Sequence, residues 1–208
     1  MRISFKILAG VSLVGLVLAV LFIVRHDENY WLQEFFFRER YSRYDRLIAD
    51  AAERYGVSPA LVKAVIWRES RFHPHMWGGR GERGLMQITE GAASDWAKAE
   101  KVETFVPTDL FDPKTNIEAG TWYLARALKH WSAKDDPIPF ALAEYNAGRS
   151  RVNRWELSGM ADGKFGSEEL AATMDFPSTK AYVDAILARH RAFLRDGFFL
   201  DRAGESGD

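Results

Sequence analysis

The chain has 208 residues, and this length, less an apolar N-terminal stretch, predicts one compact domain with its own core. Its formal net charge of -1, with basic residues scattered along the chain, argues against nucleic acid as a partner. It has no cysteine, which excludes a disulfide framework, a thiolate metal site, a cysteine nucleophile and a lipid-modified cysteine.

Residues 1–25 are predicted to form a membrane anchor. Residues 7–24 carry no charge, and a run of this length almost spans a bilayer. Because the run is longer than the core of a typical signal peptide and no clear small-x-small cleavage site follows it, we favour an uncleaved anchor over a cleaved signal peptide. Residues 26–43 are rich in aromatic and basic side chains, which suits either a collar at the lipid headgroups or a first helix packed on the core.

The next two helices are predicted from apolar spacing and from capping residues. Apolar residues between 47 and 55 recur at helical spacing, and Gly56 then suits the left-handed position that ends many helices. Ser58-Pro59 is typical of a helix cap and first turn, so a short apolar helix is expected to begin there and to end before Pro74.

The rest of the chain also predicts helices joined by loops. Glycines cluster between residues 78 and 84, so this stretch is expected to be a loop. Further helices are predicted at residues 88–96, 112–131, 140–147 and 178–193, with Ser178 as the cap of the last one. No strand-like alternation competes with them, so the predicted fold class is all-α, with loops around a groove. The folded domain is expected over residues 44–195, followed by a polar tail at 196–208.

One acidic residue lies on the apolar face of the helix after Pro59. Glu69 follows Val62 by seven residues and Val65 by four, so it continues the apolar stripe. Desolvation on that face and the nearby helix C-terminus both raise the pKa of a carboxyl group, as a general acid requires. The alternative from spacing alone is that Glu69 pairs with Arg68 or Arg71.

Several short motifs follow one another along the predicted domain. They are Trp67-Arg68-Glu69-Ser70 with Phe72, Gly84-Leu85-Met86-Gln87-Ile88, Phe111-Asp112-Pro113 through Asn116-Ile117 and Gly120, Tyr145-Asn146-Ala147-Gly148, and Ala181-Tyr182-Val183. In this order they resemble the soluble-type lytic transglycosylase (SLT) family, a branch of the goose-lysozyme fold. The resemblance covers about residues 44–195 and implies a lysozyme-like (goose-type) helical domain with a substrate groove.

The resemblance implies a reaction on bacterial peptidoglycan with one catalytic carboxylate, Glu69. In the family this glutamate protonates the glycosidic oxygen between N-acetylmuramic acid and N-acetylglucosamine. It then takes the proton of the muramoyl C6 hydroxyl, which attacks C1 and closes a 1,6-anhydro ring. No water and no cofactor take part, and the N-acetyl oxygen of the substrate assists in place of a second carboxylate. With an anchor, the enzyme would be a single-pass protein of the cytoplasmic membrane, its catalytic domain on the outer side.

The resemblance also implies a set of substrate-binding residues. They are Ser70, Met86, Gln87, Glu144, Tyr145, Asn146 and Tyr182. The alternative for Met86 and Tyr182 is a place in the core, and the alternative for Asn146 is a plain helix C-terminus.

Some positions depart from the pattern of the family. Many members have a serine where this chain has Gly78, which puts a second hydroxyl near the acid in doubt. Members often have a small residue at the position of Glu144, so this carboxylate is either a second acid in the groove or a solvated side chain. His73 and His75 lack a His-Glu-x-x-His pattern, so no metal is expected.

Two other functions are consistent with the motifs. A muramidase on the same fold would hydrolyse the same bond with water, and a non-catalytic tether would only bind peptidoglycan. The groove motifs favour the transglycosylase over the first, and the intact Glu-Ser pair argues against the second. Protein partners are not predicted.

Overall fold

The structure, a computed structural model, describes residues 15, 18, 37–159 and 165–195. The chain divides into two compact units, residues 1–43 and residues 44–208. In the first unit, the described residues include the short helix α3 (Arg38–Ser42). The predicted anchor, apart from residues 15 and 18, and the predicted tail lie outside the described residues. Within the described ranges, no helix is both long enough and apolar enough to cross a bilayer.

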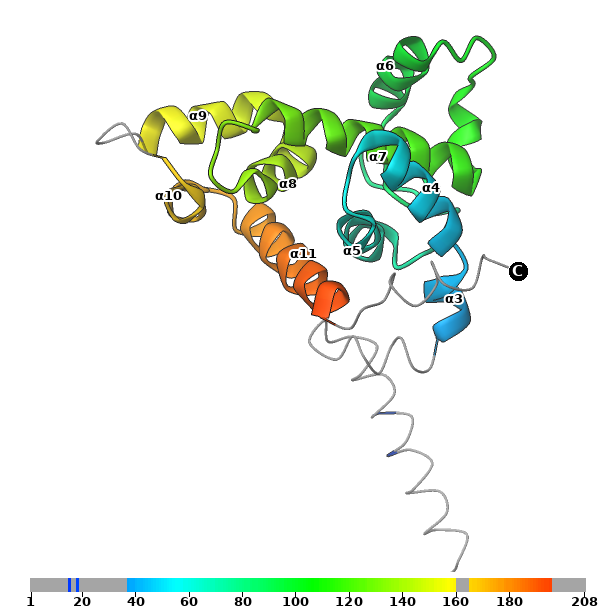
Figure 1. The fold of residues 1–208 in the computed structure, drawn as a ribbon, viewed down its shortest axis with the longest axis horizontal. Coiled ribbons are helices and arrows are strands. Elements are labelled where there is room, and N and C mark those ends of the chain that lie inside the picture. Colours follow the sequence, from blue (N-terminus) through cyan, green and yellow to red (C-terminus); the bar gives the residue numbers. More distant parts are fainter. Residues whose placement is uncertain (1–14, 16–17, 19–36, 160–164, 196–208) are drawn as a thin grey trace, which may run out of the picture. The chain divides into compact units, whose positions relative to one another are not determined.

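The second unit is helical, as predicted. Its described elements are α4 (Asp45–Tyr55), α5 (Pro59–Ser70), α6 (Glu90–Glu100), the 3-10 helix η2 (Pro107–Phe111), α7 (Pro113–His130), α8 (Pro137–Ala147), α9 (Arg149–Gly159), α10 (Ser167–Thr173) and α11 (Pro177–Arg195) (Figure 1). The described residues contain no strand, only isolated bridges of Arg83 with Trp77 and with Ile88 in the loop between α5 and α6. The all-α prediction is therefore confirmed for the described residues.

Several predicted helix ends agree with the structure. Gly56 adopts a φ of 66° after α4, and the Asp112 side chain accepts a hydrogen bond from the Thr115 N–H at the start of α7. Ser58 precedes α5 as predicted, but its hydroxyl does not cap the helix. It lies 3.3 Å from His190 Nε2 instead.

Three helix starts differ from the prediction. Ile88 lies outside α6, because the Thr89 side chain caps that helix. Helix α8 begins at Pro137 rather than at residue 140, and α11 begins at Pro177, which puts Ser178 in its first turn. Proline suits the first turn of a helix because the N–H that it lacks has no partner there. Helices α9 and α10 are not predicted at all, since each buries too few apolar residues to produce a clear stripe.

Helix α5 lies at the centre of the second unit. It packs against α4 and α11, and Figure 1 shows it between them. Residues 60–67 are all buried, so the helix is covered on every side rather than on the single predicted face. Even Lys63 is buried, with its Nζ 2.7 Å from Asp45 Oδ1, and such pairing is what makes a buried charge tolerable. At the C-terminal end, Arg68 and Glu69 are partly exposed before the buried Ser70.

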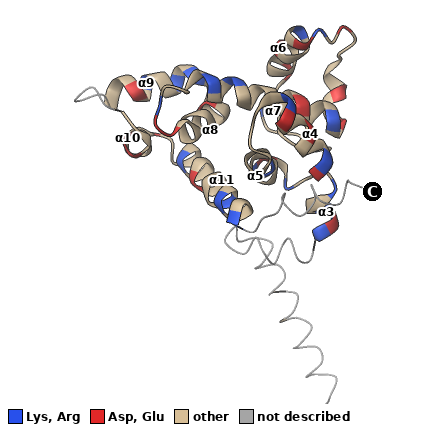
Figure 2. Cartoon of the chain, viewed as in Figure 1, with Lys and Arg blue, Asp and Glu red and all other residues tan. Residues whose placement is uncertain are grey.

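Charged side chains of both signs are mixed along the described helices. Figure 2 shows acidic and basic residues interspersed on α4 and again on α11. A surface of this kind produces no strong field of one sign over the described residues.

Candidate functional site

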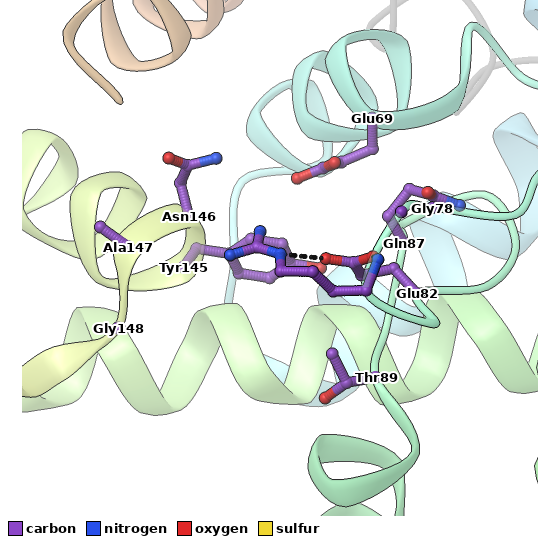
Figure 3. A pocket seen from close by; sticks show the side chains of 11 residues that line it. Glu69, Gly78, Glu82, Gln87, Thr89, Tyr145, Asn146, Ala147 and Gly148 are labelled. Atoms are coloured by element: carbon purple, nitrogen blue, oxygen red, sulfur yellow. Dashed lines mark hydrogen bonds and ion pairs between the residues drawn. The ribbon is translucent and has the colours of Figure 1, made fainter. Parts of the chain in front are cut away.

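A cavity of about 480 Å³ opens at the partly exposed end of α5 (Figure 3). Its walls come from that helix end, from the loop between α5 and α6, and from the junction of α8 with α9. The lining residues are Glu69, Gly78, Gly79, Arg80, Glu82, Gln87, Thr89, Tyr145, Asn146, Ala147 and Gly148. The cavity thus brings together four of the predicted site residues, namely Glu69, Gln87, Tyr145 and Asn146.

Glu69 extends from α5 into the cavity (Figure 3). The Tyr182 hydroxyl of α11 donates a hydrogen bond of 2.6 Å to Glu69 Oε1, so the other carboxyl oxygen, Oε2, is left to act on a substrate. Burial raises the pKa of Glu69 to about 7, against the opposing effects of the Tyr182 hydrogen bond and the Arg68 charge. The raised pKa that the sequence predicts is therefore found. It leaves a large fraction of Glu69 protonated near neutral pH, which suits a general acid.

Tyr182 and Tyr145 are the phenols nearest to this acid. Burial, and after it the charge of Glu69, raises the pKa of both phenols well above the usual range. Both hydroxyls therefore stay protonated and act as donors. The Tyr145 hydroxyl donates to the Met86 carbonyl at 2.8 Å, which ties α8 to the loop between α5 and α6.

Asn116 of α7 holds that loop in place through hydrogen bonds. Its Nδ2 donates to the carbonyls of Arg83 and Leu110, both at 2.8 Å, and its Oδ1 accepts from the Met86 N–H at 2.7 Å. Asn116 is fully buried, and its side-chain amide finds these hydrogen-bond partners inside the protein. Gly84 adopts a φ of 78°, and any side chain there would collide with Asn116. The backbone of the Gly-Leu-Met-Gln motif is thus held in place by the Asn116 side chain.

Gln87 and Asn146 lie on opposite walls of the cavity (Figure 3). The Gln87 side-chain Nε2 donates to the Met76 carbonyl at 3.2 Å and to the Gly84 carbonyl at 2.9 Å. Asn146 Oδ1 accepts a hydrogen bond of 2.8 Å from the Thr179 hydroxyl. Each amide is therefore held by its neighbours with its polar group at the cavity wall, where sugar hydroxyls and amides find partners.

Ser70 and Met86 are not among the cavity-lining residues, which corrects the predicted substrate contacts. Ser70 is fully buried, and its hydroxyl donates back to the Ile66 carbonyl at 3.3 Å in its own helix. Met86 is also fully buried, with its sulfur against Gly120 and Thr121. Both side chains are part of the core, and Met86 acts on the cavity through its backbone.

Glu144 also lies elsewhere than predicted. It is 2% exposed and does not line the cavity, so it is neither a groove acid nor a solvated side chain. Its Oε2 accepts from the Trp131 indole N–H at 2.8 Å, and Arg149 donates to Oε1 at 2.9 and 3.0 Å. Glu144 therefore joins α8 to the ends of α7 and α9.

The cavity contains a second carboxylate, Glu82, which none of the sequence motifs predicts. Glu82 comes from the glycine-rich loop and lies close to Gly78, where a Cβ would collide with the Glu82 and Gln87 side chains. No serine fits at position 78 in this arrangement. In the sequence, Glu82 is marked only as a charged residue two positions before Gly84, in the loop that follows Glu69. Within the described residues, no group of three or more metal-ligating side chains is present.

Comparison with known proteins gives matches over the same region. Residues 46–165 match the Transglycosylase SLT domain family. The chain is 37% identical over 116 residues to the membrane-bound lytic murein transglycosylase F of Desulfosudis oleivorans, which is 54% of this chain and 24% of the relative. It is 33% identical over 155 residues to the soluble lytic murein transglycosylase of Escherichia coli, which is 73% of this chain and 23% of the relative. The chain thus spans about a quarter of the length of these relatives.

The fold is similar to that of a solved structure as well. The crystal structure of the 70-kDa soluble lytic transglycosylase from Escherichia coli matches with a TM-score of 0.63 and 29% sequence identity. The match covers 73% of this chain and 24% of that chain. The described residues therefore have an all-helical fold similar to that of this lytic transglycosylase.

Proposed function

Because the chain belongs to the Transglycosylase SLT domain family, we propose that it is a peptidoglycan lytic transglycosylase. It cleaves the β-1,4 bond between N-acetylmuramic acid and N-acetylglucosamine without water. The observation that carries this proposal is Glu69, a carboxyl group at the wall of a cavity with its pKa raised to about 7. The names of the relatives, which are lytic murein transglycosylases, support the same substrate class.

The proposed reaction uses Glu69 twice. First, Glu69 gives its proton to the glycosidic oxygen, and the electron pair of the bond from C1 leaves with that oxygen on the N-acetylglucosamine side. Second, the C6 hydroxyl of the muramoyl sugar bonds to C1, and its proton returns to Glu69. The nucleophile is already part of the substrate, so proximity replaces an activated water. The product end is a 1,6-anhydro-muramoyl sugar.

Tyr182, which lies behind the cavity wall, and several residues that line the cavity position the acid and the sugars. Tyr182 holds Glu69 Oε1 and so directs Oε2 at the bond. Gln87, Tyr145 and Asn146 supply the polar wall that we assign to the sugar chain. Ser70, Met86 and Glu144 act through the fold, because their side chains are buried away from the cavity.

Muropeptide analysis tests the proposed function. Purified sacculi are digested with the full chain, and the released fragments are weighed by mass spectrometry. Anhydro ends run about 18 mass units below reducing ends, the mass of one water. We expect anhydro ends as the main initial product. Reducing ends as the main initial product would contradict the proposal.

A muramidase is the second candidate, because Glu82 places another carboxylate in the cavity with Glu69. Hydrolysis by an acid and a base needs two carboxylates around the bond. The same product analysis separates the candidates. The release of any fragment from the sacculi would exclude a non-catalytic tether.

We also propose that residues 1–25 hold the enzyme at the cytoplasmic membrane with the catalytic domain outside. The uncharged run at residues 7–24 supports this, as does the name of one relative, which is membrane-bound. Fractionation of expressing cells and N-terminal sequencing test it. A mature protein that starts near Arg25 and stays in the soluble fraction would contradict an anchor.

A further inference from the structure

Glu82 is a second carboxylate in the cavity of Glu69, and the reaction as proposed so far does not use it. Both residues line the cavity, and Figure 3 shows the Glu82 carboxylate below that of Glu69. The Glu82 side chain is 13% exposed, so it faces a confined space rather than bulk water. Charges in such a space act more strongly than charges in bulk water.

One neighbouring residue fixes both oxygens of this carboxylate. The Arg80 backbone N–H donates to Glu82 Oε2 at 2.8 Å, and Arg80 Nε donates to Oε1 at 2.9 Å. Gly78 leaves the room that the carboxylate fills, because a Cβ there would collide with it. Partial burial works against ionisation, but hydrogen bonds from the backbone N–H groups of Glu82 and Arg80, and from the Arg80 side chain, lower the pKa of Glu82. The carboxylate is therefore ionised at neutral pH.

A carboxylate held in this way is a poor base, and it keeps its negative charge at a fixed position in the cavity, where the exposed Arg80 guanidinium offsets part of its field. A base must take up a proton, and the Arg80 hydrogen bonds favour the form without one. Positive charge develops on the sugar ring at C1 when the glycosidic bond breaks, and a carboxylate already fixed in place stabilises that charge without rearrangement. Pairs of acids with pKa values pushed apart are typical of sites that cleave glycosidic bonds.

We propose that Glu82 is the charge-stabilising carboxylate of this cavity: it forms no bond to the sugar, takes no proton from water, and holds negative charge beside C1 while Glu69 makes both proton transfers. This inference rests on the proposed function, because it assigns Glu82 a role in the same reaction. Glu82 also acts on Glu69 itself, since its charge favours the protonated acid.

The groups that face Glu69 shift its pKa in opposite directions, which allows a test by pH. Glu82 raises the pKa of Glu69, whereas Tyr182 of α11 and the charges of Arg68 and Arg80 lower it. Tyr145 of α8 is the other titratable group at this acid. Removal of the Glu82 charge should therefore lower the pKa of Glu69. The alkaline limb of the activity profile, where Glu69 loses its proton, should move to lower pH.

The experiment compares Glu82→Gln, Glu82→Asp and a matched control, Glu90→Gln, in the full chain. Glu90 also pairs with an arginine, Arg83, at 3.6 Å, but it lies outside the cavity lining. Initial rates of muropeptide release are measured across pH, with product masses and melting temperatures for each protein. We expect Glu82→Gln to slow release about 10- to 100-fold and to move the alkaline limb to lower pH, with anhydro products retained. Glu82→Asp should restore the limb, and Glu90→Gln should match the wild type.

Other outcomes overturn the inference in ways that can be told apart. If Glu82→Gln has the wild-type rate and the wild-type alkaline limb of activity, Glu82 has no charge-stabilising role, and the proposed function still stands. A slow variant with an unmoved limb and a lower melting temperature makes Glu82 a structural residue only. If the wild type instead gives reducing ends that disappear in Glu82→Gln, Glu82 is the base of a hydrolase, and the proposed function fails as well.

Discussion

Two glutamates in the last turns of two helices have opposite roles in this structure. Glu69 lies near the end of α5 at the wall of a cavity, with a tyrosine hydroxyl as its hydrogen-bond partner. Glu144 lies near the end of α8 and is sealed in the core, with an arginine and an indole as partners. Glu144 is the more buried of the two, so burial alone does not make an acid. The two carboxyl groups also differ in their hydrogen-bond partners.

The partners explain the difference in physical terms. A neutral phenol leaves Glu69 without a countercharge in direct contact, so desolvation raises its pKa to about 7. Arg149 instead gives Glu144 a countercharge, and Trp131 satisfies its other oxygen. Only the Glu144 side of this pair is buried, and with all its hydrogen-bond partners in place it acts as a structural element. Four predictions test this comparison, in order of expected effect.

The largest effect is expected from Glu69→Gln. The amide keeps the shape of the side chain but has no proton to transfer, so muropeptide release should fall by about 10²- to 10⁴-fold or more. The melting temperature should not fall. Glu53→Gln, an exposed glutamate on α4, is the matched control and should keep wild-type activity. Near wild-type digestion by Glu69→Gln would remove Glu69 from the mechanism.

The pH dependence of stability should also report on Glu69. Its pKa is 4.5 without the fold and about 7 in the folded protein, so the folded state holds the proton more tightly. The stability from this group is fully present below about pH 4.5 and is lost as pH rises through about 7. Glu69→Gln lacks this loss, so at about pH 8 it should be more stable than the wild type by up to about 3 kcal/mol. Chemical denaturation of both proteins at about pH 5 and about pH 8 gives the free energy of unfolding at each pH. The same change in this free energy between the two pH values for both proteins would contradict the raised pKa.

Glu144→Ala should lower stability rather than catalysis. The change leaves the buried Trp131 indole N–H and the Arg149 guanidinium without their acceptor, which costs about 1–3 kcal/mol. Activity per folded molecule should fall only slightly. The matched control is Glu156→Ala, whose partly exposed pair with Lys134 should contribute about 0–1 kcal/mol. A folded Glu144→Ala protein as inactive as Glu69→Gln would reverse the comparison.

Tyr182→Phe should have the smallest effect and a diagnostic sign. The Tyr182 hydrogen bond lowers the pKa of Glu69, so its removal should move the alkaline limb of activity to higher pH, opposite to Glu82→Gln. The rate at the pH optimum should fall by only about tenfold, since Glu69 keeps its proton but loses its orientation. Tyr55→Phe removes a hydroxyl that accepts from Trp96 elsewhere in the fold and serves as the control. An unmoved limb would show that Tyr182 is a packing residue.

The sequence by itself determined most of the helices and the place of Glu69 on its helix. Helical spacing, glycine at a left-handed position and proline in a first turn are local properties, so α4, α5 and α7 can be predicted with their ends nearly in place. Glu69 is predictable for the same reason, because its position in the apolar stripe is set by its own helix. Helices α9 and α10 are not, since few of their residues are buried.

Only the tertiary structure decided which side chains share the cavity. Tyr182 reaches Glu69 because α11 packs against α5, and Ser70 and Met86 turn into the core although they adjoin predicted site residues. Glu82 is in the cavity because Asn116 of α7 fixes the loop that carries it, whereas Glu144 is held away by Trp131 and Arg149. The physical reason is that a pKa and a contact depend on distances between elements far apart in the chain. Spacing within one helix does not contain those distances.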